Sequence, residues 1–136
     1  MSSRTSIFVR WQVNADQNGL GELFSGYKLY MDDGYGGDFN IVLDTVGFTN
    51  KITEYLATNL SPSLLYRFKV AAYNKNNVAG ELSEISTIMA CDVPSLFAKP
   101  SKLSTTRSSI TVNWNEPADN GGCSILGYSV HIDDGN

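Results

Sequence analysis

Two stretches of the sequence, one near each end, resemble each other closely enough to be copies of one repeat. Residues 5–11 (Thr-Ser-Ile-Phe-Val-Arg-Trp) match residues 108–114 (Ser-Ser-Ile-Thr-Val-Asn-Trp) at an offset of 103. Residues 26–34 match residues 127–135 at an offset of 101, and both stretches end with Asp-Asp-Gly. Because an internal repeat constrains every later assignment, the chain is expected to contain parts of two similar units.

The matched stretches have the alternating pattern of β-strands. Ile7, Val9 and Trp11 fall on one side of an extended chain, and the residues between them fall on the other. The same alternation, bounded by Gly, Asn, Asp, Ser or Pro, recurs in residues 26–32, 39–44, 52–58, 65–73 and 84–90. No window of a dozen residues has the period of a helix. The pattern predicts an all-β chain of short antiparallel strands, with hairpin turns at Asp33-Gly34 and Asp134-Gly135.

Residues 60–74, which begin Leu-Ser-Pro-Ser-Leu-Leu-Tyr and continue with strand alternation, resemble the signature of fibronectin type III domains. In that family, the positions of Leu60, Pro62 and Tyr66 form the tyrosine corner that precedes strand F. Trp11 and Trp114 also match the family's strand B tryptophan, and Tyr27 matches the start of its strand C. The resemblance implies a structural role in the core, rather than a ligand platform, for Trp11, Tyr27, Leu60, Pro62, Tyr66 and Trp114.

The resemblance implies an immunoglobulin-like antiparallel β-sandwich, with one near-complete copy and the first half of a second. Residues 1–90 are expected to form a fibronectin type III domain that lacks strand A. Its strands B, C, C′, E, F and G are expected at residues 5–13, 25–32, 39–46, 51–58, 65–73 and 84–90. Residues 91–136 are expected to form the N-terminal half of a second domain, with strands A, B and C at about 95–105, 108–116 and 126–133.

The sequence contains few residues that could form a catalytic site. Ser129, His131 and Asp133 are the residue types of a hydrolase triad and share one face of an expected strand. Same-face neighbours on a strand are about 6.6 Å apart, which is too far for a proton relay. The chain has 1 His and 2 Cys, and no cation-binding loop spacing accompanies its paired Asp residues. We therefore expect no enzyme activity, no catalytic, cofactor-binding or metal site, no cofactor and no small-molecule substrate.

Charge and hydropathy exclude two further classes of partner. The 10 basic residues are scattered singly among 14 acidic ones, giving a net charge of −4. Nucleic-acid binding requires clustered Lys and Arg, so it is not expected. No apolar run has the length of a membrane span, so direct membrane insertion is not expected either.

Two modifications stay open at this level. The resemblance implies that Cys91, before strand A, and Cys123, in the B–C loop, lie at the same pole of the second domain. They form either a disulfide or two free thiols in a reducing compartment. Asn59-Leu60-Ser61 is a sequon for N-glycosylation, although a buried Leu60 and the following Pro62 disfavour transfer to Asn59.

The predicted function is that of a non-enzymatic structural and protein-interaction module. The resemblance implies a segment of a tandem fibronectin type III array, similar to arrays in large proteins of single-celled eukaryotes, that acts as a semi-rigid spacer or adhesion segment. Its expected partners are proteins, including neighbouring domains of the array, in an extracellular or cell-surface setting. The alternatives are an accessory spacer domain of a secreted enzyme and a component of an intracellular, ciliary or cytoskeletal filament.

Overall fold

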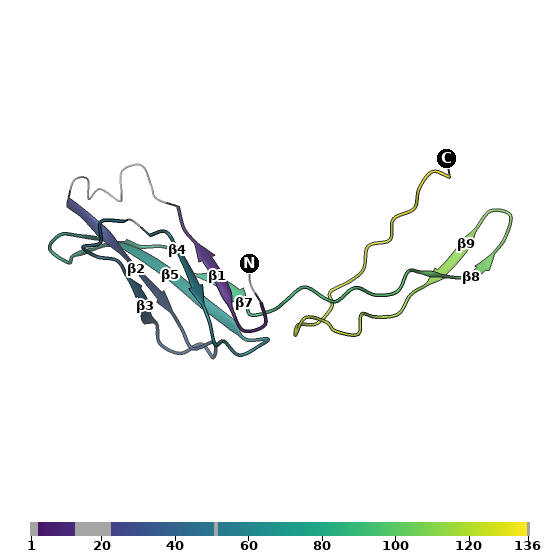
Figure 1. The fold of residues 1–136 in the computed structure, drawn as a ribbon, viewed down its shortest axis with the longest axis horizontal. Coiled ribbons are helices and arrows are strands. Elements are labelled where there is room, and N and C mark those ends of the chain that lie inside the picture. Colours follow the sequence, from purple (N-terminus) through teal and green to yellow (C-terminus); the bar gives the residue numbers. More distant parts are fainter. Residues whose placement is uncertain (1–2, 13–22, 51, 136) are drawn as a thin grey trace. The chain divides into compact units, whose positions relative to one another are not determined.

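The chain forms two compact units, Met1–Cys91 and Asp92–Asn136. The structure is a computed structural model that describes residues 3–12, 23–50 and 52–135. Residues 13 and 51, at the ends of two expected strands, lie outside this range. In the described residues, no sheet contains strands of both units. The first unit holds β1–β7, and the second holds β8 and β9 (Figure 1).

The first unit is made of two antiparallel sheets. The smaller sheet pairs β1 with β4, and the larger has the order β3-β2-β5-β6, with β7 also paired to β5. The strands are β1 (Ile7–Arg10), β2 (Phe24–Met31), β3 (Asn40–Asp44), β4 (Glu54–Ala57), β5 (Leu65–Asn74), β6 (Ala79–Leu82) and β7 (Ser86–Met89). The all-β chain expected from the alternation and the β-sandwich implied by the resemblance are both confirmed.

The core of the first unit lies between these sheets because each strand directs alternate side chains inward. Along β5, Tyr66 and Phe68 are buried, whereas Arg67 and Lys69 are partly exposed. The smaller sheet contributes Ile7, the innermost residue of β1. The buried apolar cluster consists of Ile7, Leu29, Ala57, Leu60, Tyr66, Phe68 and Ala90.

A glycine permits the close contact that follows β3. Gly26 in β2 is buried, and a Cβ atom at this position would clash with the backbone carbonyl of Thr45. Thr45 is itself fully buried, and its Oγ1 accepts the Tyr27 N–H at 2.9 Å. The Tyr27 carbonyl accepts the Thr45 N–H, also at 2.9 Å. The absence of a side chain at Gly26 therefore lets β2 hold the end of β3.

Two features of the first unit differ from the expected strands. The strand expected at residues 84–90 forms only as β7, and an additional strand that was not expected, β6, precedes it at Ala79–Leu82; both pair with β5. The hairpin expected at Asp33-Gly34 joins β2 and β3, but its connection is the longer loop 32–39. Gly34 has φ 82° there, and Asp33 Oδ1 accepts the Tyr35 and Gly37 N–H groups. These side-chain hydrogen bonds stabilise a loop wider than a two-residue turn.

The second unit is a β-hairpin, and the segments on either side of the hairpin are hydrogen bonded to each other. β8 (Ser101–Thr105) pairs with β9 (Ile110–Asn113) in antiparallel fashion, and all residues of both strands are exposed. Near the start of the unit, Asp92 N–H donates to the Gly121 carbonyl at 2.9 Å. Ser95 N–H donates to the Asp119 carbonyl at the same distance.

The strand C expected at residues 126–133 does not form in the structure. In the first unit, the matching strand β2 pairs with β3 and β5. No strand of the described residues pairs with the segment 126–133. The turn expected at Asp134-Gly135 retains a left-handed Gly135, with φ 79°.

Gly26→Ala is expected to destabilise the first unit by about 1–3 kcal/mol, because its Cβ overlaps the Thr45 carbonyl. Denaturant unfolding monitored by circular dichroism measures the change. The control is Gly127→Ala at the matching repeat position, where a Cβ meets nothing within 4 Å. Equal losses of stability in the two variants would contradict the assigned role of Gly26.

Candidate functional site

Tyr66 lies near the start of β5, and its side chain holds the segment that precedes this strand. Its ring is only 5% exposed, and its hydroxyl accepts the Ser61 N–H at 2.8 Å. Leu60 is buried beside it, while Pro62 lies on the surface. A Cβ at Gly34 would contact the Tyr66 ring, so the β2–β3 loop packs on the same side chain. These contacts have the geometry expected of a tyrosine corner, and they give Leu60 and Tyr66 a structural role.

A buried ion pair joins β5 to the residue that follows β2. The Asp32 side chain is fully buried, and Arg67 Nε donates to its Oδ2 at 2.7 Å. Asp32 Oδ1 accepts the backbone N–H of Arg67 at 2.8 Å and that of Gly34 at 3.2 Å. Burial raises the pKa of Asp32, but these hydrogen bonds and the Arg67 charge outweigh it, so the pKa lies below its ordinary value.

Cations and aromatic rings alternate on the outward side of the larger sheet. Lys28 Nζ lies 4.5 Å from the centre of the Tyr73 ring, and Lys69 Nζ lies 4.1 Å from that of Phe39. Arg67 stacks over the same Phe39 ring at 4.9 Å. Such contacts hold long side chains against the sheet. We call this set the aromatic–cation surface: Lys28, Tyr30, Phe39, Arg67, Lys69 and Tyr73.

A pair of tyrosines lies within the aromatic–cation surface. The hydroxyl groups of Tyr30 and Tyr73 are 2.6 Å apart and share a hydrogen bond. Burial, followed by this hydrogen bond and the negative charges of Tyr73 and Asp44, raises the pKa of Tyr30 to about 12. Asp44 also pairs with Lys28 at 3.4 Å. The Tyr30 phenol therefore stays neutral at physiological pH, and the surface combines aromatic faces with partly compensated positive charge.

The sequence alone did not reveal the Asp32 ion pair or the aromatic–cation surface. Alternation puts Lys28 and Tyr30 on one face of their strand, and Arg67, Lys69 and Tyr73 on one face of another. Their contacts depend on the register, which sets Tyr30 opposite Lys69. Periodicity gives the facing of each strand but does not give the register between strands.

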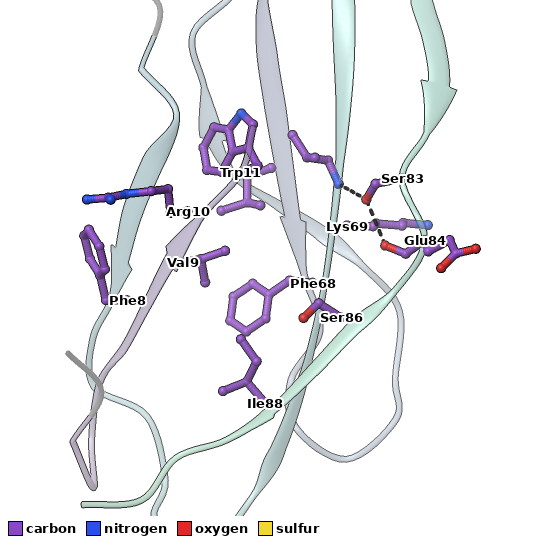
Figure 2. Close-up of a pocket in the computed structure, with 12 residues that line it drawn as sticks. Phe8, Val9, Arg10, Trp11, Phe68, Lys69, Ser83, Glu84, Ser86 and Ile88 are labelled. Carbon is purple, nitrogen blue, oxygen red and sulfur yellow. Dashed lines mark hydrogen bonds between the residues drawn. The ribbon is translucent and has the colours of Figure 1, made fainter. Parts of the chain in front are cut away.

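A groove opens between the two sheets along β1. It has a volume of about 310 Å³ and is lined mainly by apolar side chains of β1, β5 and β7. Figure 2 shows Val9 directed toward Phe68 and Ile88, with Phe8 and Arg10 on the other side of the strand. At one end lies Trp11, whose indole Nε1 is buried and has no hydrogen-bond partner among the residues that the structure describes. We call this feature the β1 groove.

Equivalent aromatic pairs form in both units. The Trp11 and Tyr27 rings meet edge to face, with centroids 5.8 Å apart. Their counterparts Trp114 and Tyr128 do the same at 5.9 Å. Burial differs, since Tyr27 is 5% exposed and Tyr128 is 39% exposed. The repeat thus preserves the contact between the two rings, whereas the depth of burial depends on the rest of each unit.

The residues considered for modification lie in both units. Asn59 is exposed and has φ 58°, next to the buried Leu60. Cys91 is the last residue of the first unit, and Cys123 lies two residues after Gly121 in the second. Neither cysteine is a free thiol in the structure.

The described residues contain no assembled catalytic or metal centre. Ser129, His131 and Asp133 lie in the segment that forms no strand, so they do not share a strand face as expected. No group of three or more His, Cys, Asp or Glu in the described part of the chain has the arrangement of a metal site. Within the same residues, no helix has the length and apolar character needed to cross a membrane.

Comparison with known proteins identifies the fold, although no family profile matches the chain. Human fibronectin type-III domain-containing protein 3A is 37% identical over 84 residues, covering 60% of this chain and 7% of that protein. Human neogenin is 31% identical over 135 residues, covering 95% of this chain and 8% of neogenin. The crystal structure of the chicken CNTN1 FN1–FN3 domains has a TM-score of 0.55 at 20% identity, covering 86% of this chain and 40% of that one.

The chain has the fibronectin type III fold. The resemblance based on the tyrosine corner is therefore confirmed. This fibronectin type III chain spans less than a tenth of the length of the two human relatives. A bacterial match, Exoglucanase B of Cellulomonas fimi, is 26% identical over 140 residues, covering 96% of this chain and 12% of that enzyme. The relatives support a structural or protein-interaction module.

Asp32→Asn is expected to destabilise the fibronectin type III fold by about 1.5–3 kcal/mol at neutral pH, because it removes the charge that Arg67 and two backbone N–H groups stabilise. Since the pKa of Asp32 is lowered in the folded state, its contribution is present above the ordinary carboxyl pKa. It is lost as the pH falls through the folded-state pKa.

The measurement is the free energy of unfolding of both proteins between neutral and strongly acidic pH. The difference between wild type and variant should shrink as the pH falls. Asp38→Asn, at an exposed position of the same loop, is the control. A difference independent of pH would show that the Asp32 charge is not the stabilising feature.

Proposed function

We propose that this chain is a segment of a tandem fibronectin type III array that spaces neighbouring domains and binds protein partners. The observation that carries the proposal is the neogenin match, whose 135 residues cover 95% of the chain and therefore reach into both units. A continuous relative of both units favours consecutive repeats of one array. The internal repeat at offsets of 101 and 103 supports the same organisation.

The junction between the units supports a semi-rigid spacer. In the first unit, Ala90 N–H donates to the Leu64 carbonyl at 3.1 Å, and the Ala90 carbonyl accepts the Ser63 N–H at 3.0 Å. In the second unit, Asp92 N–H donates to the Gly121 carbonyl. Only Cys91 lies between these anchored residues. A connection of one residue has few backbone dihedrals available for relative motion of the two repeats.

We further propose a disulfide between Cys91 and Cys123 and an extracellular or cell-surface setting. The chain has two cysteines, neither of which is a free thiol in the structure. The Asp92–Gly121 hydrogen bond brings the backbone next to Cys91 close to the segment that carries Cys123. A disulfide there persists in an oxidising compartment. In that setting, the sequon makes Asn59 a candidate for glycosylation, since its side chain is exposed.

Inserting Gly-Ser-Gly-Gly between Cys91 and Asp92 is expected to increase the independent motion of the two repeats. Residual dipolar couplings of the whole chain measure this motion. In the wild type, the two units should align with similar magnitudes, and the insertion should reduce the alignment of one unit relative to the other. The control carries the same insertion between Asn76 and Asn77, in an exposed loop. Equal coupling of the units in all three proteins would contradict a semi-rigid junction.

A second candidate is an accessory spacer of a secreted enzyme, which the Exoglucanase B match favours. Peptide mass spectrometry of the protein from its native source distinguishes the candidates. The array predicts further fibronectin type III sequence on both sides, a peptide pair linked through Cys91 and Cys123, and either a glycan or no modification on Asn59. Flanking catalytic sequence would instead assign the spacer to an enzyme. Free thiols at both cysteines would indicate an intracellular or ciliary filament.

A further inference from the structure

Two cations of the aromatic–cation surface share one ring. The Arg67 guanidinium lies 4.9 Å and the Lys69 Nζ lies 4.1 Å from the centre of the Phe39 ring. The Arg67 charge is compensated by the buried Asp32 carboxylate, and its Nη2 donates to the Gly37 carbonyl at 2.7 Å. Lys69 has no ion pair with any residue that the structure describes. The ring therefore holds an uncompensated positive charge close to a second cation, and an anion between them would relieve their repulsion.

The groups that this surface leaves for a partner are electropositive. Lys69 lies over Phe39 and, at 5.8 Å, over Tyr30, while Lys28 lies over Tyr73. Because these cations cover ring faces, ring edges and N–H donors remain, and both are the positive parts of their groups. The hydrogen bond between the Tyr30 and Tyr73 hydroxyls uses only one of their two hydrogens. A carboxylate accepts hydrogen bonds and donates none, so it complements this surface, whereas a cationic segment is repelled.

The spacing of the cations matches that of an extended peptide. Arg67 and Lys69 are same-face neighbours on β5, about 6.6 Å apart along the strand. Lys28 extends this row on β2, where it lies opposite Ala71, and Asp44 compensates part of its charge at 3.4 Å. Alternate side chains of an extended segment have the same spacing, so carboxylates at every second residue meet successive cations. The cations are far apart in the sequence, and the register of β2 on β5 brings them together.

Apolar side chains flank the row of cations. Ile41 lies opposite Tyr30 in the β2–β3 pair and is 52% exposed. On the other side, Leu82 lies opposite Ala71 in the β5–β6 pair and is 51% exposed. Exposed apolar groups beside aromatic residues and Arg are typical of protein-binding surfaces. The contacts that build this surface all join residues 28–82 of the first unit, so they are independent of any sequence before or after the chain.

We propose that the aromatic–cation surface binds an extended acidic segment of a partner protein, in which carboxylates at alternate positions meet the row of cations. One carboxylate lies between Arg67 and Lys69, and the next reaches Lys28. Apolar residues of the same segment contact Ile41 and Leu82. The inference rests on the proposed function, since it names the chemistry of a protein partner. A failure to bind acidic segments would leave the spacer role intact, because the junction and the flanking sequence test that role separately.

Nuclear magnetic resonance titration of the isotope-labelled whole chain tests the proposal. The probe is the peptide Ser-Glu-Thr-Glu-Thr-Glu-Ser, and the control peptide replaces each Glu by Gln. The Glu peptide should shift the amide signals of residues 28–30 and 67–73, and added salt should weaken its binding because the charges lie at the surface. The Gln peptide should cause no shifts. Equal binding of the two peptides, no binding of the Glu peptide, or shifts confined to other strands would each overturn the proposal.

Substitutions of single cations test where the carboxylate binds. Lys69→Gln should weaken binding of the Glu peptide about tenfold, because a charge-assisted hydrogen bond is lost. Lys69→Arg keeps the charge and should bind as the wild type does. The matched control is Lys75→Gln, which removes an exposed cation from the loop before β6 and should leave binding unchanged.

The amide spectrum of each free variant establishes that the first unit still folds. Equal weakening by Lys69→Gln and Lys75→Gln would contradict the assigned position of the carboxylate. Binding of heparin, a sulfated polysaccharide, without binding of the Glu peptide would show that a protein segment is not the occupant of the aromatic–cation surface.

Discussion

The register between β2 and β5 is the constraint on which the rest of the first unit depends. It sets Tyr30 opposite Lys69 and leaves Tyr66 and Phe68 on the inner face of β5. A slip of one residue would move the two aromatic residues to solvent and bring the cations Arg67 and Lys69 into the core. The large cost of burying unpaired charge makes that alternative unstable. The core, the Asp32 ion pair and the aromatic–cation surface therefore all follow from one alignment of two strands.

The exposed apolar side chains of the second unit follow from the absence of an equivalent constraint. In the first unit, β5 contacts three other strands and contributes two of the largest core side chains. In the second unit, the segment matching β2 pairs with no described strand and forms no strand itself. Leu126 and Ile132 are consequently almost fully exposed. A stable strand needs a paired neighbour and a second apolar layer to pack against, and this segment has neither among the described residues.

Sequence reasoning recovered the features that depend on neighbouring residues, and it was less successful with those that depend on pairing. Alternation located β1 and β5, and the tyrosine corner identified the fold because its residues lie within one short stretch. The additional strand β6 was not predicted, since it is defined by its pairing with β5. The contact of Asp32 with Arg67 joins residues 35 positions apart, and no local pattern marks it.

Comparison of the two repeats distinguishes the contacts that recur in both repeats from those that depend on the surrounding strands. Trp11 and Tyr27 meet at nearly the same centroid distance as Trp114 and Tyr128, because both partners lie within the part of the repeat that is present twice. Gly26 is indispensable only where β3 closes against it, whereas Gly127 faces open space. Identical residues at equivalent positions therefore differ in energetic importance according to the strands that surround them.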